Sequence, residues 1–336
     1  MSRTVTEMHD RPVAVLVDRE GLGDVLLKLP LLRAIARGFP GRPIWWIANH
    51  TTDLAGPVRR FMPAELAVVR EERARPDEPS SEMAQRLARL PAFSLAFDTR
   101  TRIPTVWLAR RVLKAECFFC CLPGYALSAA RPAGRLMRPR HIGRRALSLA
   151  QAALGAKAEW SGALIPTQAA ADGAAALLPE GPSYIGFGVG SREARKNWPL
   201  ARFAELSRTL SGRKLAPVLL LGPQECDRAE EIRALIPGAA AIDFTTSLGG
   251  CEPLDLAVAV LRRLAAIVAN DSGVGHLAGA AGRPVVSLFG PTDPRRWAPF
   301  APLQRSIWAR NFGGDAMSLI PSEAVAHAVA ELLDCK

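Results

Sequence analysis

Short apolar runs, each followed by a turn and a helical stretch, recur along this chain and limit its fold more than any other feature. The first run is Val13–Val17, a glycine-containing turn follows it, and helical periodicity extends from Val25 to Arg37. A strand, a glycine turn and a helix together form the opening of an α/β unit. Repetition of this pattern predicts parallel sheets covered by helices on both faces.

Two such series are predicted, which suits a chain of 336 residues. In the first, strands are expected at 13–17, 44–48, 66–69 and 94–97, with helices near 25–37, 53–62, 81–89, 103–114 and 141–155. In the second, strands are expected at 184–187, 218–221, 265–269 and 285–289, with helices near 200–210, 225–235 and 321–333.

The boundary between the series is expected in or slightly before residues 161–183, which are rich in Ala, Gly and Pro. We predict an N-terminal acceptor-binding lobe at 1–165 and a C-terminal nucleotide-sugar-binding lobe at 166–320. The last segment, 321–336, is expected to form a helix that packs back on the N-terminal lobe.

Composition narrows the function classes. No apolar window approaches ~18 residues and the first ten residues are polar, so we expect a soluble intracellular protein. The cluster Cys117, Cys120 and Cys121 has no matching second pair, so buried thiols are favoured over a zinc site. A net charge of +11 favours polyanionic partners, and basic residues crowd the stretch 100–145. That stretch is either a binding surface or a solvated, arginine-rich face.

Open α/β sheets bind ligands at the carboxyl ends of their strands, which selects the turns after the predicted strands. The first is Gly21-Leu22-Gly23-Asp24, whose glycines permit a tight turn and leave amides free. Asp24 begins a helix, so it is either a helix cap or a cleft-facing base, and the two roles are compatible.

The second and third turns carry donor-type groups. Gly188, Gly190 and Ser191, with Lys196 before the next helix, are typical of a diphosphate cradle, although an ordinary basic loop has the same composition. Glu225 follows the strand 218–221 and is able to accept from ribose hydroxyls. A helix-start acid that complements the helix dipole explains Glu225 equally well.

The fourth turn is the most informative. Asp271, Ser272, Gly273 and His276 form a polar run between an apolar strand and a small-residue helix, which indicates a phosphate site. Residues 273–278 also satisfy the dinucleotide pattern G-x-G-x-x-A, but the helix that follows has only about seven residues. A nicotinamide cofactor is therefore not expected.

Several other signatures are missing from the sequence. There is no P-loop, no His-Glu-x-x-His, no Gly-x-Ser-x-Gly and no Asp-x-Asp metal–diphosphate clamp. We expect no metal and no cofactor, with the leaving diphosphate neutralised by Lys196, arginines and helix ends.

Together the four turns resemble the ADP-heptose:lipopolysaccharide heptosyltransferase family, glycosyltransferase family 9. The matching stretches are Arg19–Pro30, Lys196–Pro199 with Phe203–Leu206, Asp271–Ala278, and Leu288–Pro294 with Trp297–Pro299. The resemblance covers most of the chain and implies a GT-B fold, in which two Rossmann-like lobes with parallel sheets face a central cleft.

The resemblance also implies roles. Asp24 would be the general base on the acceptor hydroxyl, and Lys196 would hold the donor diphosphate. The donor-binding set would be Gly188, Gly190, Ser191, Lys196, Glu225, Asp271, Ser272, Gly273 and His276. Gly23, Asp98, Arg100 and Arg102 are predicted on the acceptor side, the last three from their position after a first-lobe strand.

One base without a second carboxylate nucleophile predicts single displacement with inversion. Family members act on the phosphorylated inner core of lipopolysaccharide at the cytoplasmic side of the inner membrane. The resemblance therefore implies an ADP-sugar donor, a lipopolysaccharide-core acceptor and peripheral contact with the inner face of that membrane. The basic stretch 100–145 fits such a polyanion.

Two other classes remain open from the residues alone. A GT-B-like epimerase or hydrolase would use the same diphosphate site without a glycolipid. A non-catalytic polyanion-binding protein is the other alternative. Aromatic residues make up only 6% of the chain and no recognised nucleic-acid module is present, so nucleic acid is not an expected partner.

Overall fold

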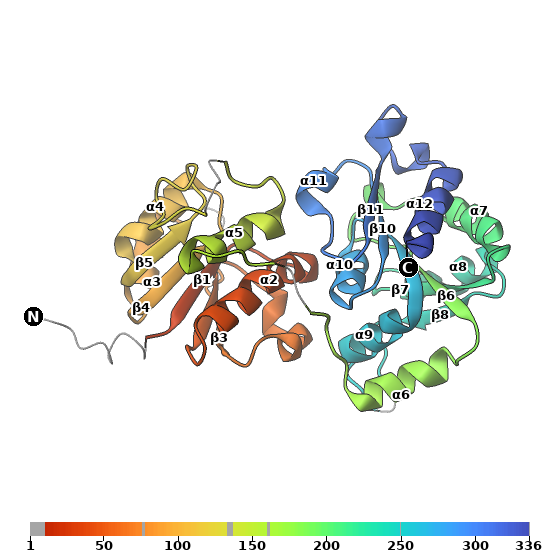
Figure 1. Cartoon of the computed structure of the whole chain (residues 1–336), viewed down its shortest axis with the longest axis horizontal. Coiled ribbons are helices and arrows are strands. Elements are labelled where there is room, and N and C mark those ends of the chain that lie inside the picture. The colour runs from red at the N-terminus through yellow and green to blue at the C-terminus, as the bar shows by residue number, and fades with distance from the viewer. Residues whose placement is uncertain (1–10, 76–77, 133–136, 160–161, 249, 336) are drawn as a thin grey trace, which may run out of the picture. The chain divides into compact units, whose positions relative to one another are not determined.

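The computed structural model describes residues 11–75, 78–132, 137–159, 162–248 and 250–335. The chain divides into two compact units, Met1–Ser161 and Gly162–Lys336. This boundary falls four residues before the one predicted from the sequence, at the edge of the Ala-, Gly- and Pro-rich stretch. Figure 1 traces both units from red to blue.

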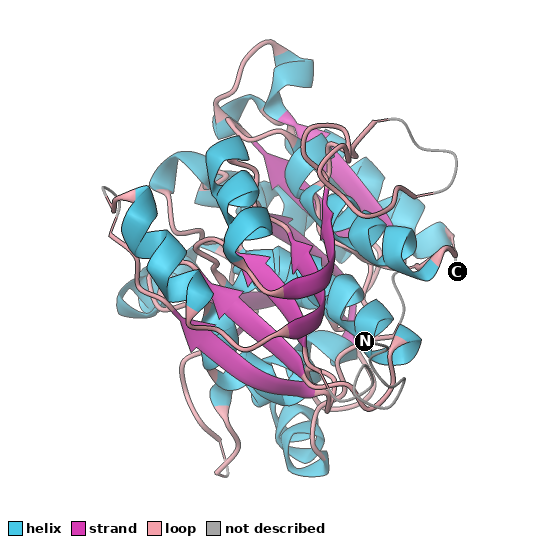
Figure 2. Cartoon of the chain, turned by 90° about the vertical axis from the view of Figure 1, so that its left-hand side faces the viewer, coloured by secondary structure: helices cyan, strands magenta, loops and turns pink. Residues whose placement is uncertain are grey.

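The first unit contains a five-stranded sheet in which every described pair is parallel. Its strands are β1 (Val13–Val17), β2 (Ile44–Ala48), β3 (Leu66–Glu71), β4 (Phe93–Asp98) and β5 (Ala115–Cys120). Their order is β3-β2-β1-β4-β5. The helices are α2 (Leu22–Gly38), α3 (Ser80–Ala88), α4 (Ile103–Val112) and α5 (Ile142–Leu154). Figure 2 shows helices on both sides of the strands.

The second unit contains a six-stranded parallel sheet in the order β11-β10-β9-β6-β7-β8. Its strands are β6 (Ser183–Gly188), β7 (Leu215–Leu221), β8 (Ala240–Asp243), β9 (Leu264–Asn270), β10 (Val285–Phe289) and β11 (Gln304–Trp308). Its helices are α6 (Gln168–Leu177), α7 (Leu200–Ser211), α8 (Ala229–Leu235), α9 (Pro253–Arg263), α10 (Gly273–Ala280), α11 (Pro294–Trp297) and α12 (Ser322–Asp334). The prediction of two parallel α/β units is confirmed.

Each sheet has one point where the strand order reverses. In the first sheet the chain runs outward from β1 to β3 and then returns to the other side of β1 as β4. In the second it runs from β6 to β8 and returns beside β6 as β9. Side chains that follow the two strands at such a point border a crevice, which is where open α/β sheets bind ligands.

Helix α12 belongs to the core of the second unit. Its buried residues Val325, Val329 and Leu332 join the cluster that contains Trp198 and Phe203. Within its own unit, the apolar face of this helix is covered by α7 and the strands β9 to β11. The sequence-based expectation that it also packs on the N-terminal lobe stays a prediction.

Two segments of the sequence were assigned differently from what the structure shows. Residues 53–62 form two short 3₁₀ segments, Asp53–Ala55 and Pro57–Phe61, because Gly56 and Pro57 interrupt an α-helix. Within the stretch expected to link the lobes lies α6, whose N-cap residue, Thr167, accepts a hydrogen bond from the Ala170 amide through its side chain.

Candidate functional site

The loop after β6 and the end of β9 meet at the reversal point of the second sheet. The connection is the buried side chain of Asn270, which accepts from the Trp198 amide (3.0 Å) and donates to the Val189 carbonyl (2.8 Å). Both partners lie more than 70 residues away in sequence. Asn270 therefore fixes the loop that carries Lys196 against the strand that leads to Asp271, a role not assigned to it from the sequence.

Lys196 and Asp271, both predicted to bind the donor, contact each other directly. The Lys196 Nζ lies 3.1 Å from Asp271 Oδ2 and 3.3 Å from Glu193 Oε1. The Thr292 hydroxyl donates to the same Asp271 oxygen over 2.7 Å. The ammonium is thus positioned by two carboxylates while its side chain keeps 18% of its exposure. A cation held in this way is available to an anionic ligand at the reversal point.

The helix α10 starts directly after Asp271, with Ser272 as its N-cap residue and Gly273 as its first residue. The Ser272 side chain makes no capping bond, and its buried Oγ has no hydrogen-bond partner among the described residues. The first amides of a helix carry partial positive charge and lack intrahelical partners. His276 lies in the first turn and is buried. This helix start offers amides and a hydroxyl to an anion, as the sequence predicts.

Glu225 lies against Gly190, so the turn after β7 reaches the loop after β6. A Cβ added at Gly190 would lie 1.9 Å from Glu225 Oε1, and the other carboxylate oxygen accepts from the Gly222 amide (3.1 Å). Partial burial raises the pKa of Glu225. Only glycine fits at position 190 beside this carboxylate.

Gly188 and Ser191 have packing roles in the same region. A Cβ at Gly188 would lie 3.0 Å from the Ala269 Cβ and 3.1 Å from Val274 Cγ1, so this glycine lets the end of β6 approach α10. The Ser191 hydroxyl is buried and lies 2.8 Å from the Glu193 carbonyl oxygen and 2.6 Å from Asn197 Oδ1. In this structure Ser191 stabilises its own loop.

In the first unit, Asp24 occupies the third position of α2. Its Oδ2 accepts a hydrogen bond from the Gly21 amide (3.2 Å), and the residue is half-buried. Gly23 is in the same turn. The N-cap residue is Gly21, and Asp24 stabilises the helix start from the third position by accepting the N-cap amide, so Asp24 is not itself the N-cap. The other carboxylate oxygen remains for chemistry.

Beneath this turn lies a buried polar cluster that sequence reasoning missed. Glu20 forms an ion pair with Lys28 and accepts from Trp46 Nε1 (3.0 Å), and all three side chains are buried. Burial raises the pKa of Glu20, the Lys28 ammonium opposes that rise, and the nearby Asp24 carboxylate adds to it. The sequence signal for this ion pair is the separation of Glu20 and Lys28 by eight residues. The cluster fixes the turn that precedes Asp24.

Asp98 and Arg100 form a bidentate ion pair inside the first unit. Arg100 Nε lies 2.9 Å from Asp98 Oδ1 and Nη2 lies 2.7 Å from Oδ2, and both side chains are buried. Sequence position predicted that both would contact an acceptor. The structure instead pairs the two side chains with each other. The end of the strand at Asp98 is buried, and the Arg100 guanidinium folds back to bind the Asp98 carboxylate.

Arg102 differs, because it lines a cavity of about 320 Å³ at the reversal point of the first sheet. The walls of this polar cavity come from the ends of β1 and β2, from residues 75 and 78–83, and from the start of α4: Asp18, Arg19, Asn49, His50, Arg75, Glu78, Met83, Arg102 and Thr105. Among the described residues, Arg19 and Arg102 have no ion-pair partner.

His50 is held at the wall of this polar cavity by its Nδ1, which donates to the Ala74 carbonyl (2.8 Å), so Nε2 is left for a ligand. Arg75 is paired with Glu82 and thus contributes less free charge. The arrangement suits a hydroxyl-rich anion. The strand-end rule would have found Arg19 and His50, which follow β1 and β2 by two residues.

The sequence profile of glycosyltransferase family 9 (heptosyltransferase) matches residues 132–317. The chain is 35% identical to lipooligosaccharide heptosyltransferase 2 of Haemophilus influenzae over 127 residues, which are 38% of this chain and 36% of that relative. It is 28% identical to lipopolysaccharide heptosyltransferase 1 of Pseudomonas aeruginosa over 297 residues, 83% of this chain and 79% of that one. The matches to the first relatives thus span about a third of their length.

Solved structures share the whole fold. The ADP-heptose lipopolysaccharide heptosyltransferase II of Escherichia coli superposes with a TM-score of 0.66 at 21% identity, covering 96% of this chain and 98% of that one. An Escherichia coli heptosyltransferase solved with ADP gives 0.61 at 20% identity, with 95% and 99% covered. A family 9 glycosyltransferase from Veillonella parvula gives 0.68 at 19% identity, with 98% and 99% covered. The predicted GT-B fold is confirmed.

Proposed function

The chain belongs to glycosyltransferase family 9 (heptosyltransferase), and we propose that it transfers a heptose or a related sugar from an ADP-sugar to a lipopolysaccharide-core acceptor. The observation that carries this proposal is the assembly of Lys196, Asp271 and the start of α10 at the reversal point of the second sheet. Two of the relatives are named as lipooligosaccharide or lipopolysaccharide heptosyltransferases, one solved neighbour is named for ADP-heptose, and another was solved with ADP.

The roles proposed for donor binding follow from the charges of the groups at the reversal point of the second sheet. The diphosphate of a nucleotide-sugar carries the negative charge that Lys196, the amides of α10 and the Ser272 hydroxyl are arranged to receive. Diphosphate oxygens would take the place of one carboxylate beside Lys196. Glu225, beside Gly190, would accept from the ribose hydroxyls. His276 and Asp271 would complete the site.

The roles proposed for acceptor binding and catalysis are assigned to residues of the first unit. Asp24 would accept the proton of the acceptor hydroxyl, and the oxygen of that hydroxyl would attack the anomeric carbon of the donor. The bond between that carbon and the diphosphate oxygen breaks, and ADP leaves with the electron pair. One displacement inverts the anomeric configuration. Arg19, His50 and Arg102 in the polar cavity would bind the anionic groups of the acceptor.

We propose that leaving-group charge is neutralised by the protein and that activity persists in the presence of chelator. The support is Lys196, held at the donor site by two carboxylates, together with the lack of an Asp-x-Asp pair anywhere in the sequence. Preorganised cations and helix amides stabilise a departing diphosphate at no cost in reorganisation.

Lys196→Gln is expected to weaken ADP binding about 10- to 100-fold, because a charge-assisted hydrogen bond to the diphosphate is lost. Binding of adenosine, which lacks the diphosphate, is expected to stay unchanged. Thermal shift measures this: ADP at ~100 times its dissociation constant adds about 2.7 kcal/mol to the wild-type stability, a rise of several degrees.

The matched control is Arg195→Gln, an exposed neighbour that pairs with Glu193 in the same loop. The melting temperature of this control variant should rise with ADP by as much as that of the wild type. Equal ADP affinity in the wild type and Lys196→Gln would remove Lys196 from the donor site. A larger shift with UDP, GDP or CDP than with ADP would contradict the ADP-sugar assignment.

A further inference from the structure

The outward side of α4 carries an unusual combination of side chains. The exposed residues of this helix and of the positions next to its two ends, here called the α4 face, are Arg102, Ile103, Pro104, Trp107, Arg110, Arg111 and Lys114. Ile103 is 53% exposed and Trp107 is 47% exposed. They are four residues apart and so lie on the same side of the helix.

The opposite side of α4 explains why these apolar groups point outward. Val106 and Ala109 are fully buried in the core of the first unit, together with Leu113 just beyond the helix. The helix therefore already has a buried apolar side that holds it to the sheet. Ile103 and Trp107 lie outside that core cluster, and a large exposed apolar group in a cluster commonly marks an interaction surface.

The charge of the α4 face is uniform. Four of its seven residues are cations, and no Asp or Glu occurs anywhere in residues 102–114. The Arg111 guanidinium lies 4.7 Å from the centre of the Trp107 ring, so cation and aromatic ring are held together. The nearest carboxylate in sequence, Glu116, is paired with Arg11.

We propose that the α4 face binds the surface of an anionic phospholipid bilayer, with Ile103 and Trp107 in the interfacial layer and the cations against the lipid headgroups. Tryptophan and aliphatic side chains beside Lys and Arg are the combination that such a surface selects. Cations at an anionic leaflet each contribute favourably to binding. Nucleic acid would use the cations but offers no layer for Ile103.

The position of α4 indicates what a membrane contact would do for the protein, and this step rests on the proposed function. Arg102 and Thr105, at the start of the helix, line the polar cavity of the first unit. A bilayer at the α4 face would therefore lie beside the cavity, and the headgroup sugars of a lipid-bound acceptor would reach it without leaving the membrane. None of the described helices is long and apolar enough to cross a membrane, so this contact would be peripheral.

The test is sedimentation of the full-length protein with vesicles at low salt. One set contains equal parts of phosphatidylglycerol and phosphatidylcholine, and the other contains phosphatidylcholine alone. We expect binding to the anionic set only. Arg111→Gln with Lys114→Gln should lower the partition coefficient about thirty-fold, from about 1 kcal/mol for each cation. Ile103→Ser with Trp107→Ser should lower it about tenfold or more.

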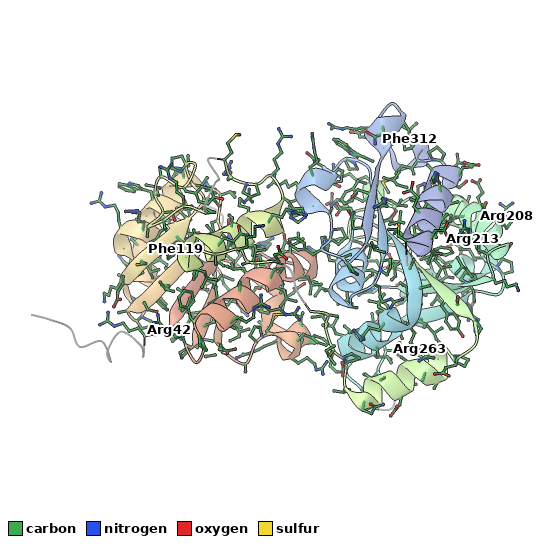
Figure 3. All side chains as sticks on the ribbon, in the orientation of Figure 1. Arg42, Phe119, Arg208, Arg213, Arg263 and Phe312 are labelled. Atoms are coloured by element: carbon green, nitrogen blue, oxygen red, sulfur yellow. The ribbon has the colours of Figure 1, made fainter. Side chains whose placement is uncertain are left out.

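Matched controls come from the second unit. Phe312→Ser removes another exposed aromatic group, and Arg208→Gln removes another exposed cation; Figure 3 labels both residues. These variants should bind vesicles as the wild type does. The proposal is overturned if the α4 variants bind as tightly as the controls, or if the wild type ignores anionic vesicles. It is also overturned if the α4 variants lose only binding to DNA.

A separate readout distinguishes this contact from the transfer reaction itself. The α4 variants should keep the wild-type thermal shift with ADP and the wild-type rate on an acceptor freed of its lipid chains. Their rate on the same acceptor embedded in vesicles should fall in parallel with vesicle binding. If no transfer occurs with any acceptor, the proposed function fails, while the vesicle measurement still tests the α4 face.

Discussion

Asp24→Asn is expected to lower kcat by about 10²- to 10⁴-fold, which is the usual contribution of a positioned general base. The amide cannot take the proton of the acceptor hydroxyl. It can still accept the hydrogen bond from the Gly21 amide that Asp24 Oδ2 accepts now, so the start of α2 should remain intact. The measurement is steady-state transfer with saturating donor, alongside calorimetric titration with ADP.

The control for this substitution is Asp53→Asn, which alters an exposed aspartate in the same unit. Its kcat should match that of the wild type. ADP should bind to both variants with unchanged affinity, because the residues proposed to bind the donor belong to the second unit. Full activity in Asp24→Asn would show that another group removes the proton.

Arg100→Met is expected to destabilise the first unit by about 3–5 kcal/mol, because it leaves the buried Asp98 carboxylate without its partner. Asp98 is fully buried and receives three hydrogen bonds from Arg100. The measurement is the unfolding midpoint in urea. The double variant Asp98→Asn with Arg100→Met removes both charges and should recover much of the loss.

An exposed arginine gives the comparison for this pair. Arg89→Met should change the midpoint little, since Arg89 is at the surface. If Arg100 bound the acceptor instead, as its sequence position predicts, Arg100→Met would keep the stability of the wild type and would bind the acceptor more weakly. That second result would contradict the structural role assigned here.

The strands next to the reversal points were predictable from the sequence. Val13–Val17, Ile44–Ala48 and Val285–Phe289 match the structure residue for residue, because strands buried on both faces form uninterrupted apolar runs. The edge strands β5, β8 and β11 were missed, whereas the edge strand β3 was predicted at 66–69. β11 contains Gln304, Arg305 and Ser306, and the edge strand β5 was read only as a cluster of buried thiols.

The contact between Lys196 and Asp271 was predictable, because both residues lie beyond strands that end at the same reversal point. Their role in donor binding stays a prediction. What the sequence does not reveal is which polar groups are used up internally. Asp98 and Arg102 both follow β4, yet one is buried in an ion pair and the other lines a cavity. Burial depends on the covering helices, and no local pattern specifies it.

The measurement that tests the central claim most directly is mass spectrometry of the acceptor after incubation with the protein and ADP-heptose. We predict a gain of one heptosyl unit on a lipopolysaccharide-core acceptor, with one ADP released for each unit transferred and the anomeric configuration inverted. Release of ADP and free sugar with an unchanged acceptor would contradict the account, because it would show a hydrolase that uses the same donor site.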